Sequence, residues 1–109
     1  GAVGSALSNG SLCPAKGALS NHFQGLSGEI TLLHVPTGAA VRYNPDPGFS
    51  FLMLWNGGGS SGFVCPEPQS WQVNAPNSPL PPDMTGFRFL APGEEMHFIS
   101  RLSIDLGAL

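Results

Sequence analysis

The stretch of the sequence best suited to chemistry centres on Glu67, which stands between two prolines. It runs from residue 63 to residue 77 as FVCPEPQSWQVNAPN. Pro66 and Pro68 each fix their own φ at about −65° and push the residue before them toward extended geometry. A carboxylate held on so stiff a backbone suits a positional task such as general-base catalysis.

Uncharged polar side chains and an aromatic ring follow Glu67 closely along the chain. The amides belong to Gln69, Gln72, Asn74 and Asn77, and the ring belongs to Trp71. Amide groups donate and accept hydrogen bonds, while an indole offers a flat apolar surface. This combination matches the mixed hydroxyl and C–H surface of a sugar. The residue types also allow an alternative, in which Glu67 is a solvated loop carboxylate and Trp71 packs in the core.

The composition indicates the scaffold that must position these groups. The chain has 109 residues, enough for one domain, and contains 15 Gly and 11 Pro. Inside a helix, Gly costs about 1 kcal/mol and Pro about 3 kcal/mol relative to Ala, so long helices are disfavoured. A hydrophobic fraction of 41%, with seven Phe and two Trp, argues against disorder. The sequence therefore predicts a compact fold that is rich in strands and turns.

The charge balance narrows the range of partners. The net charge is −3, and the basic residues are the scattered Lys16, Arg42, Arg88 and Arg101. They form no patch for a phosphate backbone or an anionic lipid surface, so neither nucleic acid nor membrane is an expected partner. The longest apolar run, residues 49–55, falls far short of the roughly 20 residues that span a bilayer. With no signal-peptide pattern at its start, the sequence favours a cytoplasmic location.

The cysteines and histidines give no sign of a metal centre. Cys13 and Cys65 are expected as free thiols, because a disulfide-dependent scaffold normally carries more cysteines, although one disulfide remains the alternative. His22, His34 and His97 lie in three separate segments without zinc-ligand spacing. We expect no metal, with His97 on the surface and His34 at a strand end or packed beside it.

Alternation and turn signals predict an antiparallel all-β fold, a sandwich or part of one. The expected strands are residues 29–35, 39–44, 49–55, 63–65, 86–90 and 95–105. The first two form a hairpin, the third is apolar on both sides and should be covered on both, and the last alternates apolar with polar residues. Residues 1–19 are expected as a linker or N-terminal extension, and residues 66–82 as a long loop. Trp55 is expected in the core, with a sugar-facing platform as the alternative.

The segment around Glu67 also resembles part of a known enzyme family. FVCPEPQSWQVNAPN is preceded by the apolar strand FSFLMLWN, with LSNHFQG further upstream, and is followed by GFRFLAPGEEMHFISRLSI. This order of an apolar strand, a Glu-Pro-Gln element, a downstream Asn and a Leu-x-Pro-Gly-Glu turn resembles the C-terminal part of aldose 1-epimerases, the galactose mutarotase-like family. The resemblance runs from about residue 19 to residue 104.

The resemblance implies a fold, an activity and a substrate. Residues 20–109 would form the C-terminal part of a galactose mutarotase-like supersandwich that binds a hexose, such as glucose or galactose, on one sheet. Glu67 inherits the role of general base, which takes the proton of the anomeric hydroxyl while a histidine protonates the ring oxygen. The implied substrate contacts are Gln69, Trp71, Asn74, Ser20 and Asn21. No cofactor is required, because acid–base chemistry suffices.

Two departures from the family pattern leave alternatives to catalysis. The family's catalytic histidines lie in the part of the fold that precedes this segment, and none of the three histidines here occupies a matching position. Ser20 stands where the family commonly has an Asp that binds a substrate hydroxyl, and a serine offers no charged acceptor. The chain could therefore be a sugar-binding module without catalysis. It could also be a structural β-domain that pairs with another copy or with a missing N-terminal half.

Overall fold

The computed structural model describes residues 1–107, which form two small antiparallel sheets and several short helical turns. The helical elements are α1 (Ala2–Ser8), the 3-10 turns η1 (Pro14–Lys16) and η2 (Ala75–Asn77), and α2 (Pro82–Thr85). The strands are β1 (Ser20–Gln24), β2 (Ile30–His34), β3 (Ala39–Asn44), β4 (Phe51–Trp55), β5 (Cys65–Gln69) and β6 (Arg101–Asp105). The first sheet has the order β1-β4-β5 and the second sheet the order β2-β3-β6.

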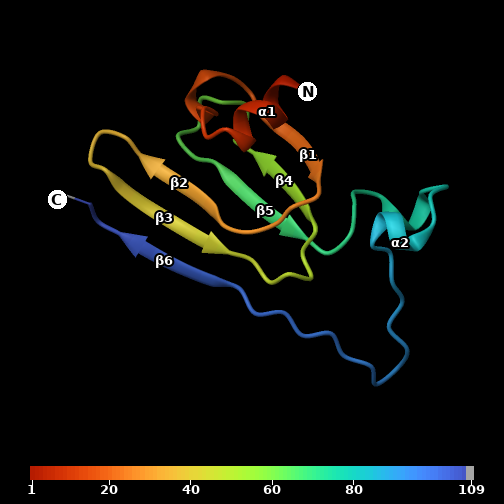
Figure 1. Cartoon of the computed structure of the whole chain (residues 1–109). Coiled ribbons are helices and arrows are strands. Elements are labelled where there is room, and N and C mark those ends of the chain that lie inside the picture. The colour runs from red at the N-terminus through yellow and green to blue at the C-terminus, as the bar shows by residue number, and fades with distance from the viewer. Residues whose placement is uncertain (108–109) are drawn as a thin grey trace.

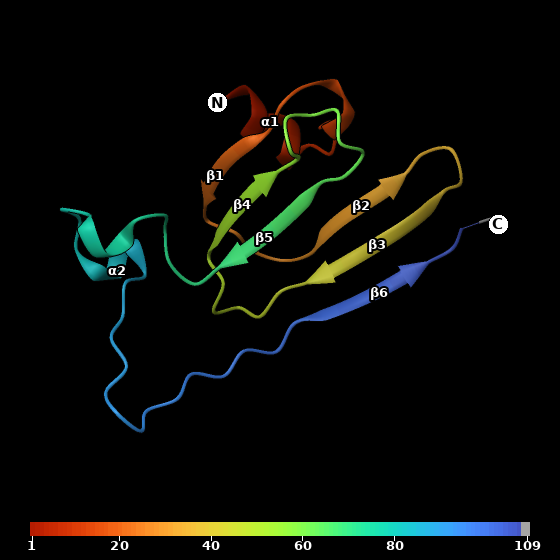
Figure 2. The same ribbon diagram turned by 180° about the vertical axis from the view of Figure 1, so that it is seen from behind.

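The two sheets lie next to each other rather than stacked face to face (Figure 1 and Figure 2). The extensive contacts between elements occur between neighbouring strands of one sheet, and the molecule measures 49 × 27 × 24 Å. α2 lies at the end of the molecule beyond β5 (Figure 1). The antiparallel all-β architecture agrees with the prediction from sequence. None of the helices within residues 1–107 has the length and apolar character that crossing a membrane requires.

The first sheet is built around the most apolar strand of the chain. β4 lies between β1 and β5, and its residues Phe51, Leu52 and Leu54 are buried. Side chains on both faces of a strand can be buried only where both faces of the sheet have cover. The strand predicted at residues 49–55 is therefore confirmed, with its start moved to Phe51.

β5 differs from the prediction. The sequence predicts a strand at residues 63–65 and a loop from residue 66, whereas the strand begins at Cys65 and includes both prolines. β5 is an edge strand of the first sheet, so the missing N–H groups of Pro66 and Pro68 can face its open side without losing a partner. Glu67, between the two prolines, is the residue that pairs with Met53 of β4. The prolines keep this edge from pairing with a further strand, and they do not end β5.

The second sheet confirms the predicted hairpin, because β2 and β3 pair antiparallel over their full lengths. β6 adds to β3, but it covers only Arg101–Asp105 and is shorter than the predicted residues 95–105. The prediction of a strand at residues 86–90 is wrong, since this segment follows α2 without pairing in a sheet. Its Phe87 packs against Trp71 and Phe89 instead.

The alternation predicted for the last strand is present and gives the second sheet two different faces. Its apolar face carries Ile30, Leu32, Val41, Tyr43, Leu102 and Ile104, as the strand pairing requires. Arg101, Ser103 and Asp105 point to the other face. Leu102 is 69% exposed and Ile104 is 70% exposed, so the described residues leave the apolar face open along β6.

A buried amide attaches the N-terminal segment to the end of β4. Asn56 is only 1% exposed. Its Oδ1 accepts a hydrogen bond from the backbone N–H of Leu19 at 2.8 Å. Its Nδ2 donates to the carbonyl oxygens of Pro14 at 2.9 Å and Gly17 at 2.7 Å. Because both N–H groups and the oxygen are used, this side chain fixes the stretch from η1 to β1 against the first sheet.

Candidate functional site

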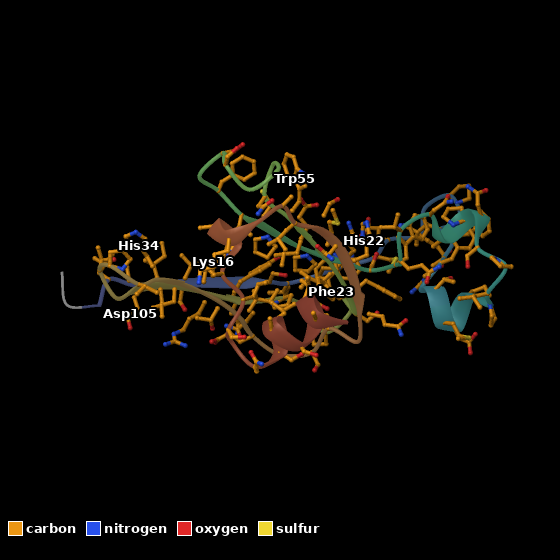
Figure 3. The ribbon with its side chains drawn as sticks, turned by 90° about the horizontal axis from the view of Figure 1, so that it is seen from above. Lys16, His22, Phe23, His34, Trp55 and Asp105 are labelled. Atoms are coloured by element: carbon orange, nitrogen blue, oxygen red, sulfur yellow. The ribbon has the colours of Figure 1, made fainter. Side chains whose placement is uncertain are left out.

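One face of the first sheet gathers side chains from all three of its strands. Residues directly opposite each other in an antiparallel sheet point to the same side, so the pairing defines rows across the sheet. These rows are Ser20–Trp55–Cys65, His22–Met53–Glu67 and Gln24–Phe51–Gln69, and we call the surface that they form the site face. Figure 3 shows His22 and Trp55 on one side of the ribbon, and Phe23 on the other side with the red helix α1.

The middle row contains the predicted base. Met53 lies between His22 and Glu67 and pairs with both. Neighbouring strands are about 4.8 Å apart, so the backbones of His22 and Glu67 are separated by about 10 Å. Both side chains are exposed, while Met53 is half-buried between them. The row therefore presents an imidazole and a carboxylate on either side of the apolar Met53 side chain.

A shallow pocket of about 350 Å³ lies beside the middle row. Its lining includes His22, Gln24, Phe51, Gln69 and Gln72. The volume is at the lower end of the range for small-ligand sites, which starts at about 300 Å³. Three glutamine amides around a phenyl ring offer uncharged donors and acceptors beside an apolar surface. Glu67 is one row away, two residues before Gln69 on β5.

The loop that follows β5 folds back over one end of the site face. The backbone N–H of Gln72 donates to the carbonyl oxygen of Thr85 at 2.8 Å, which closes the loop. Gly86 has a φ of 75°, and a Cβ there would clash with the backbone at Trp71 and press on the Phe51 ring. Glycine alone permits this approach. The loop thereby buries Phe51 and builds one wall of the pocket.

Aromatic pairs lie at both ends of the site face. Trp55 meets Phe63 with ring centroids 5.3 Å apart, and Trp71 stacks on Phe87 at 5.1 Å. The prediction that Trp55 lies in the core is wrong, because Trp55 is 42% exposed. Its position in the row that ends with Cys65 turns the indole toward the site face, where Phe63 covers only part of it. An accessible indole offers a flat apolar surface, as the alternative expectation of a platform at Trp55 requires.

Four of the predicted site residues lie at or beside the site face. Glu67 and Gln69 are on β5, and Ser20 is on β1 in the row next to Glu67. Trp71 follows Gln69 by two residues and lies at the Phe51 end, as the position of Gly86 shows. The structure therefore places the predicted carboxylate beside predicted polar and aromatic partners.

Two other predicted contacts lie apart from this group. Asn21 alternates with Ser20 and His22 and points to the opposite face of the sheet, and its Oδ1 accepts from the Ser20 backbone N–H at 3.1 Å. Asn74 lies further along the loop in a left-handed conformation with a φ of 58°. Its Oδ1 accepts a hydrogen bond from Nδ2 of Asn77 at 2.7 Å. Both side-chain oxygens thus accept hydrogen bonds from residues close by in the sequence.

His22 is the functional candidate that sequence reasoning misses. The comparison of motifs gives it no role, yet residues two apart on a strand share a face, and His22 stands two residues after Ser20. The sequence does not predict β1 as a strand, so it gives no indication that Ser20 and His22 share a face. The other histidines are remote from the site face: His34 ends β2, and His97 is exposed and lies 2.9 Å from Glu95.

The carboxylates with shifted pKa values lie outside the site face. A hydrogen bond from Thr31 and another from Arg42 lower the pKa of Glu29, at the start of the second sheet. The backbone N–H groups of Ile99 and Gly48 lower the pKa of Asp46. Both carboxylates accept hydrogen bonds in their ionised form, so their role in the structure is to hold turns and strand ends together.

The thiols and the metal-binding residue types form no centre in the described part of the chain. Cys13 and Cys65 are both free thiols, with Cys13 exposed and Cys65 partly buried at the start of β5. Within residues 1–107, no three His, Cys, Asp or Glu side chains are grouped so that they could hold a metal ion. The chemistry that the site face itself offers is proton transfer and hydrogen bonding.

Comparison with known proteins identifies the fold. No protein-family model matches the chain. The structure is similar to the crystal structure of a galactose mutarotase-like protein from Clostridium acetobutylicum, with a TM-score of 0.75 and 24% sequence identity. The match covers 84% of this chain and 30% of that protein, so the chain spans less than a third of its neighbour's length. The two sheets therefore form part of a galactose mutarotase-like β-sandwich.

Proposed function

We propose that this chain is the part of an aldose 1-epimerase-like protein that supplies the general base, Glu67. The observation that carries the proposal is the exposed Glu67 carboxylate on the site face of a mutarotase-like fold. A base is effective when its backbone holds it within reach of the proton that it removes. β5 meets this need, because Pro66 and Pro68 stiffen it on both sides of Glu67.

The substrate is the ring form of a hexose such as glucose or galactose. Glu67 takes the proton from the hydroxyl on C1, and the bond between C1 and the ring oxygen breaks. Its electron pair moves to the ring oxygen, which a general acid protonates, and the aldehyde forms. Rotation about the C1–C2 bond presents the other face of the carbonyl, and closure produces the other anomer. Each proton that is taken is returned in the same cycle, so acid–base groups are sufficient.

Neutral groups around Glu67 provide the sugar contacts in this proposal. The amide of Gln69 and the hydroxyl of Ser20 can bond ring hydroxyls from β5 and β1. Trp71 and the accessible Trp55 offer flat surfaces for the C–H side of the ring. Asn74 would contribute from the loop. Without a charged acceptor at Ser20, we expect weaker binding than an aspartate at that position would give.

We place the boundary of the sandwich at residue 20. Residues 1–19 are then an N-terminal extension, which begins with α1, and residues 20–109 are the C-terminal part of the sandwich. The coverage of 30% of the mutarotase-like neighbour supports the view that these residues are only a part of the sandwich. So does the open apolar face of the second sheet, because sandwich sheets normally pack such faces against another layer.

Anomer exchange, followed by NMR or polarimetry, tests the role of Glu67. We expect the chain to accelerate exchange of glucose or galactose above the rate in buffer. Glu67→Gln keeps the shape of the side chain but cannot accept the proton, so it should lose about 100-fold of this acceleration. Glu95→Gln is the matched control, because Glu95 is an exposed carboxylate beside His97 and away from the site face.

Equal acceleration by the wild type and by Glu67→Gln would remove Glu67 from the mechanism. Sugar titration followed by NMR separates binding from catalysis. Shifts around Gln69 and Trp71 without any exchange in the wild type would favour the sugar-binding module over the epimerase. No shifts at high millimolar sugar would contradict both of these functions.

A further inference from the structure

Within residues 1–107, β6 leaves one edge of the second sheet unpaired. In the order β2-β3-β6, this strand pairs with β3 on one side only. It runs along the outer side of the molecule, with no other element of the described chain beyond it (Figure 1 and Figure 2). All of its residues, Arg101–Asp105, are exposed. Such an edge offers a row of backbone N–H and C=O groups to a further strand.

The other edge strands are less suited to pairing than β6. Pro66 and Pro68 remove N–H groups from the free side of β5. β2 lies between β3 and the first sheet, so its free edge faces the molecule itself (Figure 1 and Figure 2). β6 contains no proline, and its two charged residues stand at its two ends with opposite signs. They oppose only those pairings in which like charges meet.

The sequence of β6, Arg-Leu-Ser-Ile-Asp, is complementary to itself in the antiparallel direction. When two copies are paired about Ser103, Arg101 of each copy lies opposite Asp105 of the other. In the same register, Leu102 lies opposite Ile104. Residues directly opposite each other in an antiparallel pair point to the same side of the sheet. The ionic pairs therefore lie on the polar face of the second sheet and the aliphatic pairs on its apolar face.

We propose that β6 is the interface through which two copies of this chain associate, with a twofold axis through Ser103. The product is one antiparallel sheet of the order β2-β3-β6-β6-β3-β2, in which the apolar faces of both copies join on one side. A twofold interface uses the same surface of both copies, so that surface must complement itself. The inference goes beyond the proposed function, because the site face lies on the other sheet.

Charge selects this register over its neighbours. Within residues 1–107, neither Arg101 nor Asp105 belongs to a salt bridge. One oxygen of Asp105 accepts a hydrogen bond from the backbone N–H of Gly107 at 2.9 Å, and the other oxygen is left for an arginine. An axis through Leu102 would place Arg101 opposite Ser103, and an axis through Ile104 would place Asp105 opposite Ser103. Either shift loses both ionic pairs.

The size of the interface predicts a weak dimer. One short strand from each copy buries less than the roughly 1,200 Å² of a stable specific interface. Exposed ion pairs add little strength but penalise the wrong register. We therefore expect a monomer at low micromolar concentration and a dimer at high concentration. Added salt should weaken the dimer, because it screens the two ionic pairs.

Charge reversal tests the register directly. Analytical ultracentrifugation from about 10 μM to about 1 mM gives the Kd of the wild-type dimer. Arg101→Asp places two carboxylates opposite each other in both pairs, and Asp105→Arg places two guanidinium groups there. Each variant alone should raise the Kd about 10-fold. An equal mixture of the two variants should recover the wild-type Kd, because every changed residue then meets the opposite charge.

The matched controls are Arg88→Asp and Glu95→Arg. They make the same changes in net charge at exposed residues outside β6. Each should associate like the wild type, and their mixture should gain nothing. Amide NMR spectra show whether each variant is folded. In the wild type, the amide signals of Arg101–Asp105 should move as the concentration rises, which tests the contact without any substitution.

Recovery in the mixture of the β6 variants, together with concentration-dependent signals in β6, supports the dimer. A wild-type chain that remains a monomer at about 1 mM overturns it and leaves β6 to another partner, such as a further part of the sandwich. Association that charge reversal does not change, or that the mixture does not recover, overturns this register. Concentration-dependent signals confined to the first sheet would place the contact there and overturn the role of β6.

Discussion

The first and second sheets each have three antiparallel strands, yet their surroundings differ. In the first sheet, β4 buries Phe51, Leu52 and Leu54, and the loop after β5 folds over one end of the site face. In the second sheet, every residue of β6 is exposed, and this includes Leu102 and Ile104. Similar strand pairing thus occurs with and without a packed core beside it.

The difference shows that the described residues pack a core around the first sheet but leave the apolar face of the second sheet uncovered along β6. The candidate site lies on the packed sheet, and a site must be held by rigid elements to keep its geometry. The second sheet presents a row of apolar side chains to solvent, and such a surface normally meets another protein surface.

The largest expected effect comes from one substitution made in both sheets. Leu52 is 3% exposed and Leu102 is 69% exposed. Leu52→Ala leaves a cavity and should lower the free energy of unfolding by about 3 kcal/mol. Leu102→Ala should change it by less than about 0.5 kcal/mol. Urea unfolding measures both, and a cost at Leu102 close to that at Leu52 would show that another surface, such as a second copy, covers β6.

An intermediate effect is expected at Asn56, which anchors the N-terminal segment to the first sheet. Asn56→Ala removes the partners of Leu19, Pro14 and Gly17 and should cost about 2 kcal/mol. Asn44→Ala is the control, because Asn44 is exposed and its bond to Glu29 is long at 3.4 Å. The same urea measurement applies, and equal costs at the two positions would contradict the anchoring role.

The smallest effect is expected at Asp46, where the second sheet meets the turn before β4. The backbone N–H of Ile99 and that of Gly48 lower the pKa of Asp46, so its ionised form supports the fold. The support is complete above the unfolded pKa of about 4 and is lost as the pH falls through the lower folded value. Asp46→Asn should therefore speed amide exchange at Ile99 at pH 7.

Acid titration provides the matching measurement for Asp46. The amide signals of Ile99 and Gly48 in the wild type should move toward their positions in Asp46→Asn only below about pH 4. The variant itself should show no such movement. Movement near neutral pH, or the same movement in both proteins, would assign the effect to another group.

Local patterns explain which elements the sequence predicts well. The hairpin of β2 and β3, the apolar β4 and the alternation in β6 are properties of a few adjacent residues. β5 is mispredicted because Pro66 and Pro68 usually break strands, and whether a strand is at an edge is a tertiary property. β1 is missed because its mixed polar residues become a strand through pairing with β4.

The residues of the candidate site also fall into two groups: those that local sequence reveals and those that only the tertiary structure places. Glu67 and Gln69 are recognisable from the Glu-Pro-Gln element, because short motifs carry the residue types that chemistry needs. The hydrogen bond of the Asn74 oxygen within a turn, the opposite direction of Asn21 and the exposure of Trp55 depend on backbone conformation and register. A strand shifted by one residue would exchange the two faces of the sheet.

The sequence by itself determined a β-rich chain with little charge, a carboxylate on a stiffened backbone and a likeness to mutarotases. Only the tertiary structure decided that His22 and Glu67 share one row, and that the second sheet keeps an open apolar face. The physical reason is that residue type and backbone stiffness are local, whereas a row across a sheet joins residues far apart in the sequence. Strand register decides which of them meet.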